Sequence, residues 1–184
     1  NADVVGLQEC STDAAATLAS NLGFFRTTHS GIPILSRYPI TQSLQVAGGS
    51  GATIQINSRQ KIHFFNCHLT AYPYGPYSLK DGRSRQDILR EEQQTRMPAL
   101  TNLLQAMQPY IASSTPTFLT GDFNAPSHLD YSDFPWPTSR ACIEAGLNDV
   151  YRTLHPNPRT YPALFRFDDP GITWNKRARE RDPE

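Results

Sequence analysis

The chain lacks an excess of either charge, because Lys and Arg together number 17 and Asp and Glu together also number 17. A nucleic-acid-binding protein usually carries a basic excess, so this balance argues against tight, non-specific DNA binding. No stretch reaches the roughly 18 consecutive apolar residues that a transmembrane helix needs. We therefore expect a soluble protein without a membrane span, and no targeting segment is visible that would assign a compartment.

Cysteine is also scarce. Cys10, Cys67 and Cys142 are odd in number and widely spaced, which fits neither a disulfide framework nor a zinc motif. We interpret them as free thiols, because unpaired cysteine commonly serves as a small core residue.

What the chain does contain is enough apolar sequence for a globular core. Its 184 residues are 38% hydrophobic, which suits a single domain over residues 1–184. Short apolar runs alternate with helical patterns, so we predict an α/β or α+β fold. The predicted strands cover residues 3–8, 32–36, 52–56, 61–67 and 115–120, and the predicted helices cover residues 12–22, 86–108 and 139–145.

Several turns and breaks in this order are also predicted. Ser11, Thr12 and Asp13 offer N-cap oxygens to the first helix, and Gly23 offers a stop. Pro98 predicts a kink in the long helix, or two helices joined near Arg96. The glycine-rich residues 48–51 and the polar and aromatic residues 70–85 are expected to be loops.

Three of the predicted strands end in residues that can do phosphate chemistry. The first ends at Glu9, the fourth ends at His68, and the fifth leads through Gly121 to Asp122 and Asn124. Taken singly, each has a simpler interpretation: a solvated charge, a capping histidine, or an Asx turn. Taken together, side chains at the ends of strands can converge on one cleft at the edge of a rigid sheet.

These strand ends carry a family resemblance. The segments 3–9, 34–40, 66–69 and 120–124 stand in the order seen in the endonuclease/exonuclease/phosphatase superfamily, and segments 147–152 and 173–174 are similar to its downstream blocks. This superfamily includes deoxyribonuclease I, abasic-site endonucleases, neutral sphingomyelinases, deadenylases and inositol-polyphosphate phosphatases. The resemblance implies a four-layered α/β sandwich of the deoxyribonuclease I type. It also implies divalent-metal-dependent phosphoester hydrolysis, of phosphodiesterase or phosphatase type, with Mg²⁺ or Mn²⁺.

The resemblance also assigns expected roles to the four residues at the strand ends. Glu9 matches the metal-binding glutamate, and His68 the histidine that contacts the phosphate or assists the leaving group. Asp122 matches the aspartate that orients or deprotonates the attacking water, and Asn124 the amide that holds the phosphate or a second ion. We therefore expect Glu9, Asp122 and Asn124 as metal ligands, and His68, Asp122 and Asn124 as catalytic residues. The chemistry agrees, since hard divalent cations prefer oxygen ligands and stabilise charge on a transferring phosphoryl group.

The chain departs from the family pattern at both ends. Members have an upstream strand with an active-site asparagine, and a terminal Ser-Asp-His block, neither of which is seen here. We therefore expect the chain to be truncated at both ends, with the first and last strands of the sandwich missing. A catalytically incomplete domain that acts as a binding module is the alternative.

The substrate is left open by the sequence. Cys10 follows Glu9 where abasic-site endonucleases carry a basic residue, and Ala125 and Pro126 do not match inositol 5-phosphatases. The neutral charge favours a small-molecule or lipid-linked phosphoester over nucleic acid, with a nuclease kept as the alternative. We expect the protein to be a monomer.

Three further features of the sequence are considered for the site. Tyr72, Tyr74 and Tyr77 either border the cleft or pack on the surface. Four arginines either contact phosphate or belong to a solvated helix face: Arg83, Arg85, Arg90 and Arg96. Asp149 is expected to support the site from a following strand without being catalytic.

Overall fold

The computed structural model describes residues 2–29, 31–130 and 134–156. The chain divides into two compact units, one formed by residues 1–70 and 98–124, and the other by residues 71–97 and 125–184. The first unit contains all four strand-end residues predicted for the site. The expectation of a single domain over residues 1–184 stays a prediction.

The first unit begins with a small antiparallel sheet and a helix. Its strands are β1 (Val4–Gly6), β2 (Phe25–Arg26) and β3 (Ile34–Ser36), in the order β1-β3-β2. Helix α1 (Thr12–Leu22) closes at Gly23, as predicted, with φ 65°. Of the three candidate N-caps, Ser11 is the one used, because its Oγ accepts a hydrogen bond from the Ala14 backbone N–H. Ala15 and Ala19 form its buried side.

A larger sheet forms the rest of the strands of this unit. Its strands are β4 (Ile40–Val46), β5 (Gly49–Gln55), β6 (Lys61–His68) and β7 (Thr117–Asp122), in that order. The hairpin predicted from residues 52–56 and 61–67 is confirmed, since β5 and β6 pair antiparallel. Strands β6 and β7 are parallel, and helix α4 (Met97–Ile111) lies between them in the chain.

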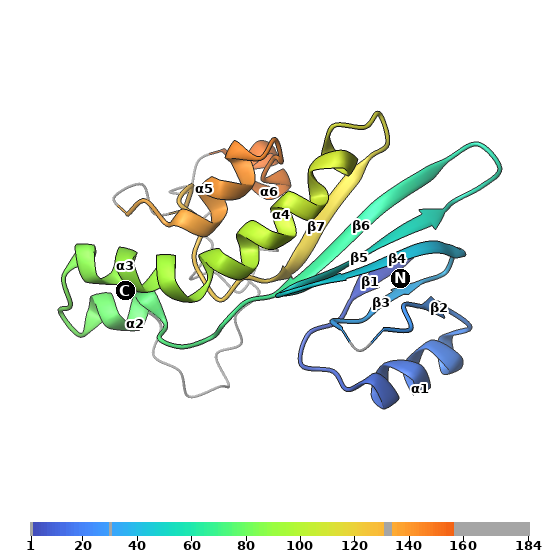
Figure 1. Cartoon of the computed structure of the whole chain (residues 1–184), viewed down its shortest axis with the longest axis horizontal. Helices are drawn as coiled ribbons and strands as arrows, with labels where there is room; N and C mark the ends of the chain where they lie inside the picture. Colours follow the sequence, from blue (N-terminus) through green and yellow to red (C-terminus); the bar gives the residue numbers. More distant parts are fainter. Residues whose placement is uncertain (1, 30, 131–133, 157–184) are drawn as a thin grey trace. The chain divides into compact units, whose positions relative to one another are not determined.

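The first unit has four layers, as predicted (Figure 1). Helix α4 covers one face of the larger sheet, where the ring of Tyr110 meets that of Phe65 at a centroid distance of 5.3 Å. The other face packs on the small sheet through a core cluster of buried residues: Ile34, Ala52, Ile54 and Phe64. Helix α1 lies beyond the small sheet (Figure 1). The predicted α/β sandwich is therefore confirmed.

The prediction of a loop at residues 48–51 holds for Gly48, which lies in a turn, but is wrong for residues 49–51, because β5 begins at Gly49. The glycines stand in this strand where neighbouring side chains lie over its backbone. A Cβ on Gly51 would lie 2.4 Å from the ring of Phe65, and one on Gly49 would lie 3.0 Å from the methyl groups of Leu103. The strand β4, which contains mostly exposed polar residues, was also not predicted.

The second unit is helical in its described part. It contains α2 (Gly75–Lys80), α3 (Arg85–Thr95), α5 (Pro137–Glu144) and α6 (Val150–Leu154). Its apolar cluster is formed by Ile88, Phe134 and Trp136. The alternative of two helices joined near Arg96 is confirmed, whereas the prediction of a loop over residues 70–85 is wrong for α2. This short helix fits because Gly75 lets the Trp136 ring approach its backbone, where a Cβ would lie 2.5 Å from the ring.

Arg96 lies in the interior of the second unit, so neither expectation for it holds. Its side chain is 0% exposed, and its Nη1 donates to Glu92 Oε1 at 2.8 Å. Its Nη2 donates to the backbone carbonyls of Ala71 at 2.8 Å and Pro73 at 2.7 Å. The buried pair therefore fixes the segment that connects β6 to α2.

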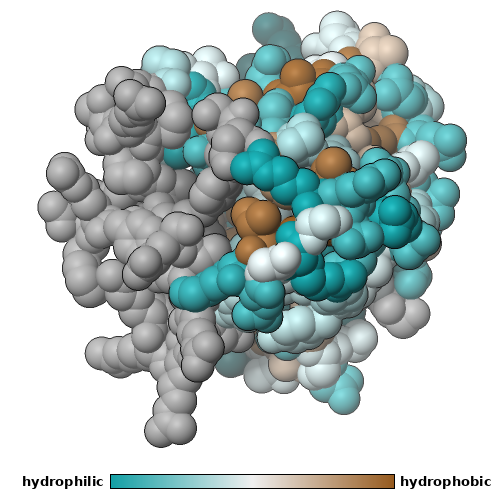
Figure 2. Space-filling model, turned by 90° about the vertical axis from the view of Figure 1, so that its left-hand side faces the viewer, coloured by the Kyte–Doolittle hydropathy of each residue, from teal (hydrophilic) through white to brown (hydrophobic). Residues whose placement is uncertain are grey.

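The other three arginines considered for the site also have partners within the second unit. Arg83, just before α3, bonds to Glu91, and Arg90 bonds to Asp87 at 2.9 Å. The guanidinium of Arg85 lies over the ring of Phe134, 5.8 Å from its centroid. The described part of the face shown in Figure 2 is mostly hydrophilic, with hydrophobic residues in small separate spots. Within residues 2–29, 31–130 and 134–156, no helix combines the length and the apolar character needed to cross a bilayer.

Candidate active site

The parallel pairing of β6 and β7 places the predicted site residues side by side. His68 is registered opposite Asp122, and Asn66 opposite Thr120. Because side chains alternate between the two faces of a sheet, these four point to the same side. That side faces the small sheet, because Asn66 bonds to Leu7, the residue that follows β1. The side chain of Phe65, on the opposite face of β6, packs against Tyr110 of helix α4. Register alone therefore brings the histidine and the aspartate together.

Glu9 reaches this place from the small sheet. It lies three residues beyond the end of β1, and its backbone adopts φ 50°, which is unusual for a residue with a side chain. Its Oε1 lies 3.9 Å from Nε2 of His68, and its side chain is 81% exposed. The structure thus brings Glu9 and His68 together from segments that are distant in the sequence. Beneath them, Gln8 bonds to Asn66, which lies 58 positions further along the chain.

The turn after β7 is held by Asp122 and Asn124. Asp122 Oδ1 accepts a hydrogen bond from the Asn124 backbone N–H at 2.9 Å, and Asn124 has φ 48°. The Asn124 Nδ2 donates to the Leu69 carbonyl at 2.9 Å, just beyond β6. The Asx turn and the site arrangement are therefore not alternatives: the turn is what places the Asn124 amide beside the end of β6.

Gly121 is required by the close approach of β7 to β6. Its φ is 144°, and a Cβ there would lie 2.2 Å from the Cys67 carbonyl oxygen and 2.7 Å from Cys67 Sγ. Cys67 is itself fully buried and, like Cys10 and Cys142, forms no disulfide. A residue with a side chain at position 121 would push Asp122 out of register with His68.

Asn66 is a residue beneath the site that was not predicted. It is 0% exposed, and its amide Nδ2 donates to the carbonyls of Leu7 at 3.0 Å and Pro33 at 3.3 Å. Its Oδ1 accepts from Gln8 Nε2 at 2.5 Å. The signal in the sequence is a single amide inside the apolar run of β6, two positions before His68.

The oxygen ligands at this edge fit a hard divalent cation. The Glu9 carboxylate accepts no hydrogen bond from any residue that the structure describes. The available donors are two carboxylates, Glu9 and Asp122, and the amide oxygen of Asn124. Mg²⁺ typically uses one or two carboxylates, keeps several waters and takes further ligands from substrate phosphate. In the described residues no three His, Cys, Asp or Glu side chains cluster as a metal site.

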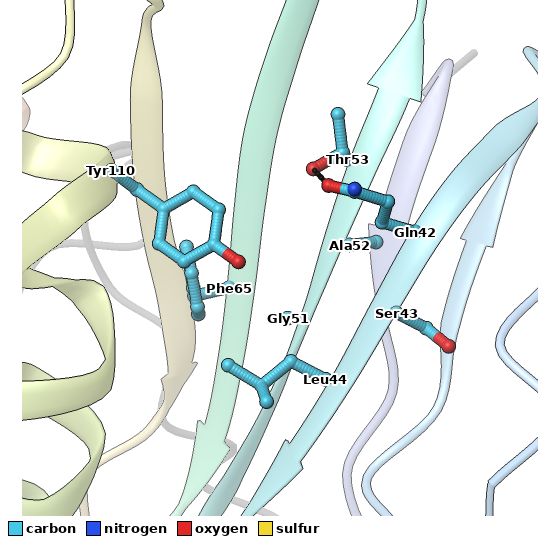
Figure 3. A pocket seen from close by; sticks show the side chains of 8 residues that line it. All are labelled: Gln42, Ser43, Leu44, Gly51, Ala52, Thr53, Phe65 and Tyr110. Carbon is cyan, nitrogen blue, oxygen red and sulfur yellow. Dashed lines mark hydrogen bonds between the residues drawn. The ribbon is translucent and has the colours of Figure 1, made fainter.

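The hollow shown in Figure 3 is separate from this edge. It has a volume of about 360 Å³ and is lined by residues of β4, β5 and β6 together with Tyr110 of α4. Phe65 and Tyr110 line it, so it lies on the face of the larger sheet that carries α4. The catalytic candidates point to the opposite face, so the hollow is not their cleft.

Other expected site features are placed differently or lie elsewhere. Asp149 is not in a strand: it is the N-cap of α6, where its Oδ1 accepts from the Arg152 backbone N–H at 2.9 Å. An aspartate in this position is a common helix start, so the sequence carried a signal that the prediction of a strand overlooked. Tyr72 is 65% exposed, while Tyr74 and Tyr77 pack edge to face at 4.9 Å. The segment 173–174 lies outside the described residues.

Comparison with known proteins decides the family. The model of the endonuclease/exonuclease/phosphatase family matches residues 1–179. The chain belongs to this family. The resemblance of the four strand-end segments is therefore confirmed over nearly the whole chain.

A relative and two solved structures are also similar to the chain. An uncharacterised protein of Caenorhabditis elegans, F14F9.5, is 29% identical over 199 residues, which cover 95% of this chain and 61% of that protein. The human nocturnin catalytic domain, solved with a bound sulfate anion, matches with a TM-score of 0.57 at 18% identity, over 83% of this chain and 60% of that one. A conserved protein of unknown function from Enterococcus faecalis V583 matches with a TM-score of 0.52 at 15% identity, over 77% of this chain and 57% of that one. The chain thus spans about three fifths of the length of these proteins, and the structural matches show the fold.

Proposed function

We propose that this chain carries the metal-binding part of a phosphoester hydrolase that uses Mg²⁺ or Mn²⁺. The observation that supports the proposal best is the meeting of Glu9 and His68, at 3.9 Å, beside Asp122 in the paired strand. Family membership supports the reaction class, and the oxygen donors at this edge support the choice of cation. The substrate is a small-molecule or lipid-linked phosphoester, in keeping with the balanced charge of the chain, and the protein acts as a monomer.

Each residue of the set has a role that its chemistry allows. Glu9, Asp122 and Asn124 would hold the cation, which when bound neutralises charge on the phosphoryl group. Asp122 takes the proton of the attacking water through the carboxylate oxygen that the Asn124 N–H does not occupy. His68 donates a hydrogen bond from Nε2 to a phosphate oxygen or to the leaving group. The Asn124 side chain, fixed by Leu69, sets the position of its own amide oxygen.

The test is hydrolysis of bis-p-nitrophenyl phosphate by the protein with Mg²⁺ or Mn²⁺. We expect a rate that EDTA abolishes and that falls by at least about 100-fold in a Glu9→Ala and Asp122→Ala double variant, as expected for loss of the groups that position and activate the reactants. Glu144→Gln is the matched control, because this carboxylate is 69% exposed and belongs to α5 of the second unit. A wild-type rate no greater than that of the double variant would show that the proposal is wrong.

Two alternatives give different results in the same experiment. A binding module that has lost catalysis would bind the phosphoester without hydrolysing it. A nuclease would degrade plasmid DNA or RNA under the same conditions, with the same dependence on Glu9 and Asp122.

A further inference from the structure

We propose that Asn66 is a positioning residue for the Glu9 carboxylate and thereby sets the affinity of the site for its cation. The inference rests on the proposed function, because it assigns a role to a residue beneath the same site. Asn66 itself is 0% exposed and does not contact a ligand. Its effect passes through the two residues that precede Glu9.

The amide of Asn66 is used to its full hydrogen-bonding capacity. Its Nδ2 has two hydrogens, which go to Leu7 O at 3.0 Å and Pro33 O at 3.3 Å. Its Oδ1 accepts from Gln8 Nε2 at 2.5 Å, and it shares the single hydroxyl hydrogen of Thr120 with the Phe65 carbonyl, both acceptors lying 3.4 Å from Thr120 Oγ1. A primary amide offers no more than these four bonds. One side chain on β6 therefore joins the small sheet to β6 and β7.

These bonds act at the point where strand pairing no longer holds the chain. The last paired residue of β1 is Gly6, opposite Ile34, and Leu7 N then donates to Pro33 O at 2.9 Å. Asn66 holds the Leu7 carbonyl and the Gln8 side chain. The next residue is Glu9, whose positive φ of 50° needs support from its surroundings. Loss of the amide would release Leu7 and Gln8 and let the Glu9 carboxylate leave its place beside His68.

The packing around Asn66 offers a control that separates positioning from stability. A Cβ on Gly6 would lie 2.4 Å from Cγ of Asn66. An alanine at position 6 is therefore excluded in the native protein, but its methyl group would enter the space that Asn66→Ala leaves empty. The double variant Gly6→Ala with Asn66→Ala restores the packing without restoring the hydrogen bonds.

The experiment is a Tb³⁺ luminescence titration of the full chain, with urea unfolding measured on every variant. Tb³⁺ is an oxygen-preferring probe, and Glu9→Gln should abolish its binding at the site. We expect Asn66→Ala to weaken Tb³⁺ affinity by about 10- to 100-fold, as for other residues that orient a ligand from behind. We expect Gly6→Ala with Asn66→Ala to recover stability while its Tb³⁺ affinity stays weak. Ile54→Ala, in the core of the same unit, should lower stability and leave the affinity unchanged.

Each outcome decides the inference. Wild-type affinity in Asn66→Ala, with Glu9→Gln still binding no Tb³⁺, would overturn the role of Asn66 and leave the metal site intact. Affinity that recovers together with stability in the double variant would reduce Asn66 to a packing residue. Tb³⁺ binding that does not depend on Glu9 would overturn both this inference and the proposed metal site. If Asn66→Ala does not fold, Gln8→Met is the substitute, because it removes the bond from Gln8 to Asn66 and keeps the amide in place. We expect Gln8→Met to weaken Tb³⁺ affinity about fivefold. An unchanged Tb³⁺ affinity would overturn the inference.

Discussion

Replacing Gly121 with alanine should destabilise the protein far more than a typical surface substitution. The new methyl group would lie 2.2 Å from the Cys67 carbonyl oxygen and 2.6 Å from the Cys67 backbone nitrogen. Both atoms belong to the backbone of β6, so no side chain can move aside to relieve the contact. Because β6 is paired on both sides, relief requires that β7 separate from β6 between Thr120 and Asp122.

The magnitude follows from two additive costs. A non-glycine residue at φ 144° costs about 1–3 kcal/mol of backbone strain, and forcing a methyl group into a packed site costs about 1–3 kcal/mol more. We therefore expect Gly121→Ala to lower the free energy of unfolding by about 2–6 kcal/mol. Gly23→Ala is the matched control, because Gly23 also has positive φ but a Cβ there meets nothing within 4 Å. The control should cost only about 1–2 kcal/mol.

Urea unfolding followed by circular dichroism measures both variants. The linear dependence of the unfolding free energy on urea concentration gives the difference between them. A loss in Gly121→Ala no larger than that in Gly23→Ala would refute the reasoning, because it would show that β6 and β7 do not approach closely at Cys67.

Two further predictions concern the second unit and the first helix. Ser11→Ala removes the N-cap of α1 and should cost about 1 kcal/mol in urea unfolding. Thr17→Ala removes a hydroxyl that bonds to the Asp13 carbonyl within the helix and should cost much less. Equal losses would contradict the capping role. Burial raises the pKa of Glu92 to about 7, against the lowering effect of Arg96. The folded state therefore binds more protons than the unfolded state between pH 4.5 and 7. The stability that Glu92 contributes is fully present below pH 4.5. As the pH rises to 7, the free energy of unfolding should fall by about 3 kcal/mol. Glu92→Gln should flatten this part of the pH profile of unfolding, and an unchanged profile would contradict the assignment.

Local signals made the best predictions of the fold. Helix α1 was predicted with its ends because Ser11 and Gly23 act through their immediate neighbours. The break between α3 and α4 followed from Pro98 for the same reason. Glu9, His68 and Asp122 could be singled out because each stands at or just beyond the end of an apolar run, which is a local feature of the sequence.

The remaining features depend on contacts between distant segments. Gly51 looks like a loop residue in the sequence, and only the ring of Phe65 above it explains why it stands in β5. Arg96 looks like part of a solvated face, because Glu92 and the carbonyls that it binds become its partners only after folding. Asn66 is similar: its four partners lie on three different segments, so its role cannot be read from β6 alone.

The most direct test of a cation at this edge is NMR of the histidine rings during addition of Mn²⁺. His68 Nε2 lies 3.9 Å from the Glu9 carboxylate, whereas His63 points to the other face of β6, against Tyr110, roughly 16 Å away along the strand. Paramagnetic broadening falls steeply with distance, so substoichiometric Mn²⁺ should broaden the His68 ring resonances far more than those of His63. The effect should vanish in the Glu9→Ala and Asp122→Ala double variant. Equal broadening of both rings, or broadening of His68 that persists in the double variant, would contradict the proposed metal site.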